Sequence, residues 1–401
     1  MKYAVVLGDG MADYPIPELD NKTPLQYAYK PNMDFLAKYG EIGMVKTIPD
    51  GLPPGSDVAN LSVMGYDPVR YYTGRSSLEA VSMGIDLSPD DVSFRCNLVT
   101  LSDEVEYADK TMVDYSSDEI SSEEAAQLIK ELNLLLKSSK VEFYPGVSYR
   151  HCLVLRGDNS KYDLTPPHDI LEKKITEYLP KGDNSKMLLE MMVKSYDILK
   201  NHPVNKARIA KGLRPANSIW LWGNGRKPSL TSFYEKYGIK GSVISAVDLV
   251  KGIGICAGLK SCDVEGATGN INTNFTGKAE AALKEFESGQ DFVFIHVEAP
   301  DECGHRHEIE NKVKSIELID EKIVGPLLQG LDKYDDYRIL LLPDHPTPLS
   351  LRTHTGEPVP YVLYQKSKRK DSGVESFDEY EARSSGIMIN EGYLMMDKLL
   401  K

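Results

Sequence analysis

Acidic and imidazole side chains directly follow several apolar runs in this 401-residue chain. Carboxylate, imidazole and hydroxyl ligands suit Mn²⁺, Zn²⁺ or Mg²⁺, and the absence of cysteine from the set argues against a purely structural zinc site. Two such ions about 4 Å apart can clamp both the attacking and the leaving oxygen of a phosphoryl displacement. Three carboxylates, three imidazoles and one serine are sufficient for two divalent ions and a nucleophile: Asp9, Asp301, Asp344, His305, His345, His354 and Ser56.

Ser56 is the candidate nucleophile of this set. Gly55 permits a tight turn before it, and the following run Asp57–Met64, closed by Gly65, has the character of one or two helical turns. Ser56 would then lie at a helix N-terminus, where free backbone N–H groups favour a phosphate. A serine hydroxyl is a poor nucleophile at neutral pH, but coordination to a metal ion lowers its pKa. Taken singly, Ser56 is equally well explained as a helix cap; the set as a whole favours chemistry.

Strand-like runs alternate with helical patterns along most of the chain, which predicts a largely parallel sheet with helices on both faces. In open sheets of this kind, ligands bind just beyond the carboxyl ends of the strands. Asp9, Asp301 and Asp344 each follow an expected strand, so we expect them to converge although they are far apart in sequence. Strands are expected at Tyr3–Leu7, Arg150–Leu155, Ser218–Trp222, Ser242–Ala246, Phe292–Val297, Arg338–Leu342 and Val359–Tyr364, and helices at Met33–Tyr39, Ser122–Lys137, Lys186–Asn201, Lys278–Glu287 and Asn311–Leu331.

The middle of the chain lacks the pattern of a strand followed by an acid. It contains a polar stretch, one strong helical pattern and the strand-like run Arg150–Leu155. We therefore expect two domains, in keeping with the length of the chain. One is a discontinuous domain of residues 1–87 plus 181–401 that carries the candidate ligands, and the other is a smaller α/β domain of residues 88–180 inserted into it.

The composition is that of an ordinary globular protein, with 41% hydrophobic and 27% charged residues. The net charge of −13 argues against a nucleic-acid partner. No apolar run approaches the roughly 20 residues that span a bilayer, and the five cysteines include no CxxC pair, so neither a membrane span nor a disulfide framework is indicated. Cytoplasmic residence as a monomer or a small homo-oligomer is the default expectation. His296, inside an apolar run, is interpreted as a core histidine.

The motifs around these residues resemble those of a known family. At these positions, and essentially from end to end, the chain is similar to the cofactor-independent phosphoglycerate mutases of the archaeal-type branch, within the alkaline phosphatase superfamily. Seven ligand positions occur in the order found in that family. The most specific matches are Leu7–Met11, Pro54–Asp57 with Asn60–Ser62, Gly65–Pro68, Ala299–His305, Pro343–Pro348 and His354–Pro360.

The resemblance implies a function and a role for each residue. The expected fold is an alkaline-phosphatase-like sheet, and the expected reaction interconverts 3-phosphoglycerate and 2-phosphoglycerate through a phosphoserine at Ser56, while the inserted domain closes to exclude water. Two divalent ions, Mn²⁺ or Zn²⁺ or else Mg²⁺, would be held in separate groups. The implied groups are Asp9, Ser56, Asp344 and His345 for one ion, Asp301, His305 and His354 for the other, and Arg150, His151, Arg208 and Arg214 for the small phosphorylated substrate, with Arg75 as a weaker candidate.

Two other functions remain open at this point. Some members of the same branch are described as proposed homoserine kinases, and the run Gly238–Gly258 is close to theirs. The absence of a GxxxxGK[ST] loop does not exclude a kinase, because a metal pair can also bind a γ-phosphate. One scaffold hosts many reactions, so fold and metals cannot separate these enzymes. A metal-binding protein without activity is the third alternative, and the retention of Ser56 with all seven ligand positions argues against it.

Overall fold

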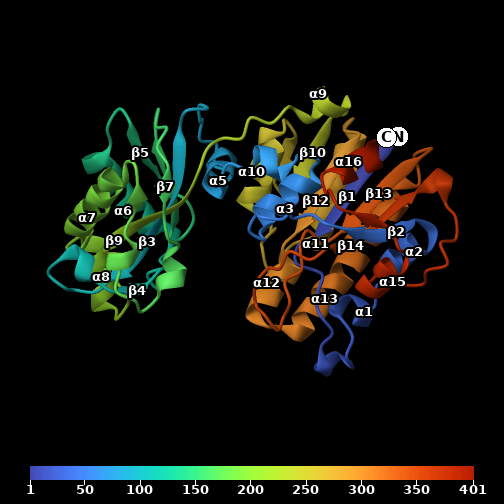
Figure 1. The fold of residues 1–401 in the computed structure, drawn as a ribbon, viewed down its shortest axis with the longest axis horizontal. Coiled ribbons are helices and arrows are strands. Elements are labelled where there is room, and N and C mark those ends of the chain that lie inside the picture. Colours follow the sequence, from blue (N-terminus) through green and yellow to red (C-terminus); the bar gives the residue numbers. More distant parts are fainter. The chain divides into compact units, whose positions relative to one another are not determined.

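The chain folds into two compact units, each with its own sheet and core (Figure 1). The structure, a computed structural model, describes residues 1–401. One unit, here called the catalytic unit, comprises Met1–Tyr72 and Ser229–Lys401, and the other, the inserted unit, comprises Thr73–Pro228. None of the helices combines the length and the apolar composition needed to cross a lipid bilayer.

The inserted unit is larger than the expected insertion of residues 88–180. Its strand β9 (Ser218–Gly225) pairs antiparallel with β3 (Val92–Leu101), and helix α7 (Ser185–Leu199) buries Leu188 and Met192 in the same core. The unit therefore ends near residue 228 and begins near residue 73. The sequence could not reveal these boundaries, because the pairing of β3 with β9 joins segments more than a hundred residues apart.

The catalytic unit is built on an eight-stranded sheet with the order β11-β10-β12-β1-β13-β14-β2-β15. Every neighbouring pair is parallel except those of β14, which runs antiparallel to both β13 and β2. This confirms the expected α/β fold with a mostly parallel sheet. The strands are β1 (Lys2–Gly8), β2 (Glu41–Val45), β10 (Gly241–Ile244), β11 (Lys260–Cys262), β12 (Phe292–Val297), β13 (Tyr337–Leu342), β14 (Val359–Gln365) and β15 (Met388–Ile389).

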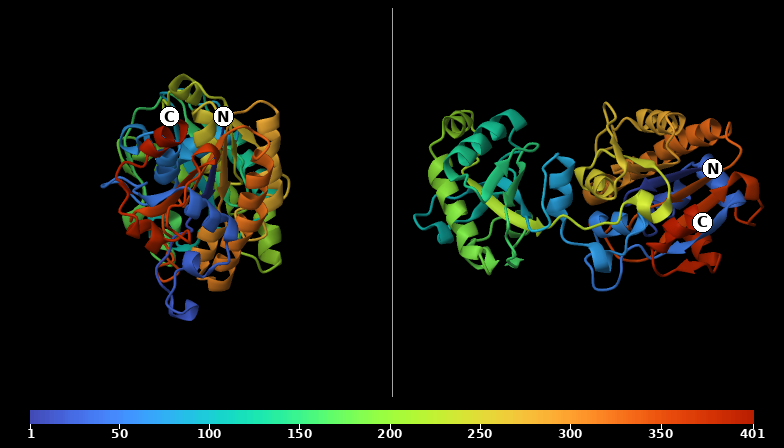
Figure 2. Two further views of the ribbon diagram at one scale, coloured as in Figure 1. Left: turned by 90° about the vertical axis from the view of Figure 1, so that its right-hand side faces the viewer. Right: turned by 90° about the horizontal axis from the view of Figure 1, so that it is seen from above.

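Helices cover both faces of this sheet (Figure 2). Ala4 and Val6 of β1 face a core that includes apolar side chains of α2, α11 and α13, whereas Arg338 of β13 reaches the last turn of α16 on the other face, where α9 and α10 also pack. These helices shield the central strands from water, which fits strands that are apolar at almost every position. The bounds are α1 (Pro24–Tyr27), α2 (Pro31–Tyr39), α3 (Ser56–Val63), α4 (Pro68–Tyr71), α9 (Phe233–Tyr237), α10 (Asp248–Cys256), α11 (Phe275–Glu287), α12 (Ala299–Arg306), α13 (Ile309–Ile319), α14 (Gly325–Leu331), α15 (Glu379–Ser384) and α16 (Leu394–Leu400).

The expected long helix Asn311–Leu331 contains a turn of π-helix at Asp320–Val324, between α13 and α14. The Asp320 carboxylate accepts hydrogen bonds from the Met33 backbone N–H at 2.7 Å and from the Asn32 amide at 2.8 Å. Because this acid satisfies donors in the first turn of α2, it fixes one helix to the end of another.

The inserted unit has an antiparallel sheet in which β3 pairs with β4, β6 and β9, and β6 pairs with β5. Its core contains Phe94 and Trp220 from the sheet and Leu128 and Met192 from two helices. The remaining elements are β4 (Met112–Asp114), β5 (Val141–Tyr144), β6 (Arg150–Leu155), β7 (Tyr162–Asp163), β8 (Lys181–Gly182), α5 (Arg75–Ser82), α6 (Ser122–Leu136) and α8 (Pro203–Ala210).

Candidate metal centre and nucleophile

Three adjacent strands of the catalytic unit deliver the candidate ligands to one edge of the sheet. β1 lies between β12 and β13 and runs parallel to both, so their carboxyl ends are neighbours. Asp9 follows β1 directly, Asp301 lies in the first turn of α12 after β12, and Asp344 follows β13. All three carboxylates are buried. The structure thus brings together acids that lie up to 335 residues apart in the chain.

Asp301, His305 and His354 form the first group of candidate ligands. Asp301 and His305 are one turn apart on α12, with 3.2 Å between Asp301 Oδ2 and His305 Nε2. His354 comes from the loop after β13, and its Nε2 lies 3.3 Å from Asp301 Oδ1 and 2.9 Å from His305 Nε2. Their ligand atoms all lie within 4.8 Å of one another. Three donor atoms that converge so closely can coordinate a single ion.

Electrostatics within this group favour an ionised carboxylate. Burial acts to raise the pKa of Asp301, but hydrogen bonds to His305 and His354 hold that pKa well below its usual value. The Asp301 carboxylate in turn raises the pKa of His305 to about 9, against the effect of burial. The His305 imidazole therefore compensates the buried negative charge of Asp301, a role that a divalent ion would take over.

Asp9, Ser56, Asp344 and His345 form the second group. Nε2 of His345 lies 3.0 Å from Ser56 Oγ, 3.4 Å from Asp344 Oδ2 and 3.5 Å from Asp9 Oδ1. Burial, followed by the nearby charge of Asp344, raises the pKa of Asp9 well above its usual value. Oδ1 of Asp9 is buried without a hydrogen-bond partner. A buried acceptor left unpaired in this way is unusual and fits a coordination site.

The donor set of the two groups suits divalent ions. None of the carboxylates of Asp9, Asp301 and Asp344 forms an ion pair with a lysine or an arginine. Burial makes the Asp9 carboxylate costly to ionise, and a divalent ion would remove that cost. Oxygen and imidazole ligands without cysteine fit Mn²⁺, Zn²⁺ or Mg²⁺.

Ser56 is the first residue of α3, and Gly55 is its N-cap. Asn60, one turn later, donates from Nδ2 to the Ser56 carbonyl and to Asp344 Oδ2, at 2.9 Å in each case. The start of α3 is therefore tied to the carboxylate that follows β13. Ser56 itself is 7% exposed. Its hydroxyl faces His345 and does not cap α3. The structure therefore does not support the alternative that Ser56 is only a helix cap.

His296 of β12 is a buried histidine with partners at both ring nitrogens. Nε2 lies 2.8 Å from Asp9 Oδ2 and Nδ1 lies 3.2 Å from Ser245 Oγ. Burial, with the nearby Lys278, lowers the pKa of His296 well below its usual value. The neutral ring therefore holds one oxygen of Asp9. This contact joins an expected core histidine to the candidate ligands, which its apolar sequence context did not indicate.

The four residues expected to bind substrate are arranged differently from the expectation. Arg208 is 2% exposed and donates to Glu124 and to the carbonyls of Ser117 and Arg214. Arg214 pairs with Asp114 at 3.1 Å. Arg208 serves the structure of the inserted unit, since its donors are already satisfied within it. The Arg214 side chain, in contrast, is 52% exposed.

His151 and Arg150 differ from each other in their exposure to solvent. His151 is buried, its Nδ1 accepts the Gly146 backbone N–H at 3.0 Å, and burial lowers its pKa to about 3. It is therefore a neutral core residue. Arg150 is exposed and lies over the ring of Tyr149. Of the four, Arg150 and Arg214 have charged groups that are open to an anion, and Arg214 already pairs with Asp114 through one nitrogen.

A basic cluster of the inserted unit was largely missed by the sequence motifs. Arg75 and Arg95 both pair with Glu79, at 2.8 Å and 3.0 Å, and the Arg95 guanidinium lies 4.4 Å from the centre of the Trp222 ring. Burial, together with the positive charges of Arg75 and Arg150, lowers the pKa of Arg95 to about 10. Three guanidinium groups thus surround one carboxylate. The available signal was a single charged residue within the apolar run of β3.

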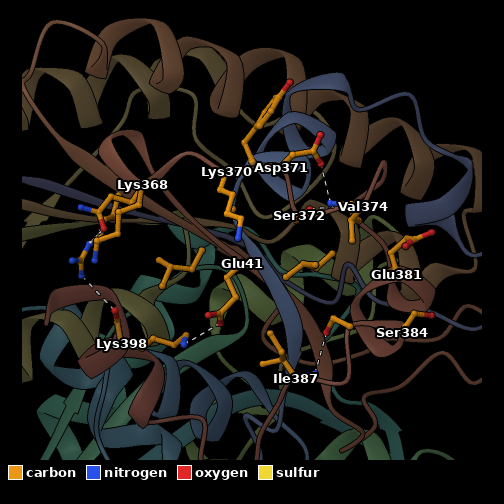
Figure 3. A pocket seen from close by; sticks show the side chains of 18 of the residues that line it. Glu41, Lys368, Lys370, Asp371, Ser372, Val374, Glu381, Ser384, Ile387 and Lys398 are labelled. Carbon is orange, nitrogen blue, oxygen red and sulfur yellow. Dashed lines mark hydrogen bonds and ion pairs between the residues drawn. The ribbon is translucent and has the colours of Figure 1, made fainter.

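One cavity of the catalytic unit lies away from the candidate ligands. Its volume is about 820 Å³, and it is lined by β2, β14 and the segments that follow β14 (Figure 3). Glu41 at the start of β2 and Arg338 at the start of β13 place it near the amino ends of these parallel strands. Lys398 pairs with Glu41 at 3.0 Å, and Arg338 donates to the Leu399 carbonyl at 2.6 Å. Because these charges are satisfied internally, the cavity offers no arrangement for chemistry.

The fold and the groups at the carboxyl edge define an α/β enzyme with a candidate two-metal centre. A family profile described as 2,3-bisphosphoglycerate-independent phosphoglycerate mutase matches residues 37–205. A protein of that name from Methanosarcina barkeri is 51% identical over 96% of this chain and 96% of its own length. The chain belongs to this family, which confirms the resemblance seen in its motifs.

Solved structures agree with this assignment. A protein from Pyrococcus horikoshii has 30% identity and a TM-score of 0.83, and the match covers 99% of this chain and 97% of that one. The cofactor-independent phosphoglycerate mutase from Thermoplasma acidophilum has 27% identity and a TM-score of 0.67, with 100% and 99% of the two chains covered. Both matches span the catalytic and the inserted unit.

Proposed function

We propose that the protein interconverts 3-phosphoglycerate and 2-phosphoglycerate, and that the phosphoryl group is carried by Ser56 between the two hydroxyl positions. The observation that carries this proposal is the Ser56 hydroxyl at the start of α3, 3.0 Å from His345 Nε2 and beside two groups of candidate metal ligands. Membership of the phosphoglycerate mutase family supports the choice of substrate.

The ligand groups would hold two divalent ions, Mn²⁺ or Zn²⁺, which would lower the pKa of the serine hydroxyl and neutralise charge on the transferred phosphoryl group. Asp301, His305 and His354 would hold one of them. Asp9, Ser56, Asp344 and His345 would hold the other. The unpaired Oδ1 of Asp9 and the missing lysine or arginine partners support the binding of ions. The division between the ions is the one that the family resemblance implies, and Asp9, Asp301 and His345 also lie close enough to share an ion.

The residues of this chain would transfer the phosphoryl group in two steps. Ser56 Oγ gives up its proton and forms a bond to phosphorus while the bond from phosphorus to the C3 oxygen of the substrate breaks, and the leaving C3 oxygen takes up a proton. The C2 hydroxyl of the retained glycerate then loses its proton and attacks the phosphoserine, the bond from phosphorus to Ser56 Oγ breaks, and Oγ regains a proton as 2-phosphoglycerate is released. The N-terminus of α3 favours the negative charge at each stage.

Glycerate must stay bound between the two steps, and we propose that the inserted unit provides this binding. Arg75, Arg95 and Arg150 form an excess of positive charge around Glu79, and guanidinium donors suit carboxylate and phosphate oxygens. Arg208 does not serve in this proposal, since it is buried and its donors are taken up by Glu124 and two backbone carbonyls. Arg214, whose side chain is 52% exposed, remains a candidate for the substrate. If glycerate were lost, water would hydrolyse the phosphoserine, so retention separates a mutase from a phosphatase.

The test compares turnover by the Mn²⁺-loaded protein on 3-phosphoglycerate with phosphorylation of homoserine by ATP. We expect mutase turnover and a phosphate on Ser56 in mass spectra taken after brief exposure to substrate. Phosphate on another residue would contradict the role of Ser56. Homoserine phosphorylation without mutase turnover would instead establish a kinase on the same scaffold.

A further inference from the structure

Thr347 places one hydroxyl between the two groups of candidate ligands. Its Oγ1 lies 2.5 Å from Asp301 Oδ1, in the first group, and 3.2 Å from Nδ1 of His345, in the second. Thr347 is fully buried, as are the side chains it contacts. It is itself absent from both groups, and its position two residues after His345 gives no sign of a contact with Asp301.

The hydrogen bonds of this hydroxyl determine which nitrogen of His345 carries a proton. The Asp301 carboxylate faces two imidazole nitrogens and this hydroxyl, all of which can donate to it. The single proton of Thr347 Oγ1 is therefore donated to Asp301, and its lone pairs face His345. Since two lone pairs cannot bond to each other, Nδ1 of His345 must carry the proton that Thr347 accepts.

The opposite nitrogen of His345 then presents a lone pair. Nε2 faces Ser56 Oγ at 3.0 Å, so the hydroxyl of Ser56 can donate to it. The same lone pair is the one that a metal ion would require, because neutral imidazole binds metals through its unprotonated nitrogen. The contact of Nδ1 with Thr347 is thus consistent with the contact of Nε2 with Ser56.

The surrounding chain holds Thr347 firmly. Its N–H donates to the Ala12 carbonyl at 3.2 Å, and its carbonyl accepts from Lys312 Nζ at 2.8 Å. A Cβ at Gly10 would lie 2.5 Å from Thr347 Oγ1, and one at Gly304 would lie 2.6 Å from the Thr347 carbonyl. Both positions must therefore be glycine for the hydroxyl to reach Asp301.

We infer that Thr347 is a positioning residue that fixes His345 in the tautomer with a proton on Nδ1 and ties His345 to Asp301 through one hydroxyl. The expected effect of Thr347 on metal binding rests on the proposed function, whereas the expected tautomer of His345 does not. Contacts of this kind around metal ligands typically change metal affinity by about 10–100-fold when they are removed. Because Thr347 contacts a member of each group, its loss is expected to weaken both ions.

The experiment uses the full chain in three threonine variants besides the unmodified form, and one further variant for assignment. Thr347→Val keeps the branched shape and removes the hydroxyl, Thr347→Ser keeps the hydroxyl, and Thr273→Val removes another buried threonine hydroxyl that accepts the Thr268 N–H at 2.9 Å. Nitrogen-15 NMR of histidine-labelled, metal-free protein reports the tautomer of His345, with His345→Gln to assign its signals. Calorimetric titration with Mn²⁺ reports the affinity of each ion.

In the unmodified protein we expect His345 with the proton on Nδ1. We expect Thr347→Val to lose that preference and to bind both ions about 10–100-fold more weakly, while Thr347→Ser and Thr273→Val stay within a few-fold of the unmodified protein. A proton on Nε2 in the unmodified protein would overturn the inference even if Thr347→Val failed to fold, as would unchanged affinities in a folded Thr347→Val. Absence of metal binding by the unmodified protein, with the tautomer as expected, would instead overturn the proposed function.

Discussion

His296 Nε2 lies 2.8 Å from one carboxylate oxygen of Asp9, while the other oxygen of Asp9 is buried and has no hydrogen-bond partner. The neutral imidazole thereby orients the carboxylate, and the free oxygen points to His345 at 3.5 Å. A histidine that donates to a ligand from behind restricts the ligand to one geometry. We therefore expect the affinity for the ion held by Asp9 to depend on His296.

Replacement of His296 by alanine should weaken the ion held by Asp9, because that carboxylate would lose its fixed orientation. We expect a loss of about 10–100-fold in affinity for that ion, a much smaller change for the ion held by Asp301, and partial recovery in His296→Gln, whose amide can also donate. Metal titration followed by calorimetry measures both affinities. His202→Ala, which changes a histidine of the inserted unit, is the control. Equal weakening of both ions in His296→Ala would indicate a general loss of packing instead.

The ligand groups predict two divalent ions per chain. Because the ions would bind the folded state, their removal should also lower thermal stability, by about 2.7 kcal/mol for each ion present at 100 times its dissociation constant. Elemental analysis after dialysis should give two ions for the unmodified protein and one for His354→Ala, since the ring nitrogen of His354 faces the group of Asp301. Its ring also packs 4.0 Å from that of His345, so His345→Ala, which should lose the other ion, is measured beside it. A single ion in the unmodified protein would refute the division into two groups.

Ser56→Ala should abolish phosphoryl transfer and leave the fold intact. The side chain of Ser56 does not cap α3, whose N-cap is Gly55, so we expect a change in unfolding free energy of about 1 kcal/mol or less. Denaturant unfolding measures this, and phosphate incorporation measures the chemistry. A matched change in the same helix, Ser62→Ala, keeps the nucleophile. Transfer that persists in Ser56→Ala would assign the chemistry to another residue.

The residues that could be placed from the sequence are those whose position depends on a single strand. Asp9 and Asp344 each follow an apolar run directly, and the rule that ligands bind beyond the carboxyl ends of strands was enough to expect them together. His296, by contrast, lies inside such a run, and its partner Asp9 is 287 residues away in the chain. No local pattern can report a contact of that separation.

The arginines of the inserted unit likewise depend on contacts between residues far apart in the chain, which no local pattern reports. Arg208 stands in a basic, exposed-looking run, yet its partner Glu124 is 84 residues away and removes it from solvent. Arg95 could have been suspected, because a charge within an apolar strand must find a partner. The identity of that partner, Glu79 on α5, depends on how the helix packs on the sheet. Arg95 shares the Glu79 carboxylate with Arg75, which leaves an excess of positive charge. Arg208 instead has Glu124 and two backbone carbonyls as its partners, and this difference separates a substrate candidate from a structural arginine.

The contrast between Arg95 and Arg208 yields a prediction for substrate binding. Arg95→Ala should weaken binding of 3-phosphoglycerate and raise the share of phosphoserine lost to water, with metal content unchanged, because positioning of the substrate depends on a paired anion. Arg208→Ala should instead destabilise the inserted unit by about 1–3 kcal/mol, since it leaves buried carbonyls unpaired. The measurements are the ratio of mutase to phosphatase turnover and the unfolding free energy. A constant ratio in both Arg95→Ala and Arg150→Ala would show that the basic cluster does not retain glycerate.

Glu379 of the catalytic unit should make stability depend on pH. Its carboxyl is buried, accepts hydrogen bonds from the Thr23 hydroxyl at 2.6 Å and from the Asp13 N–H at 3.1 Å, and burial raises its pKa from 4.5 to about 7. The folded protein therefore binds this proton more tightly than the unfolded chain. The stabilisation is fully present below pH 4.5 and is lost as the pH rises through about 7, by at most about 3 kcal/mol.

Glu379→Gln removes this titration, because the amide stays neutral. The unfolding free energy of the variant relative to the unmodified protein should thus increase as the pH rises from 4.5 to about 7. Urea unfolding of metal-free protein at several pH values in this window measures the difference and keeps metal release out of the result. Glu280→Gln, at an exposed position on α11, is the control and should leave the pH profile unchanged. A difference between Glu379→Gln and the unmodified protein that stays constant across the window would show that the buried carboxyl keeps its charge, stabilised by its two hydrogen bonds.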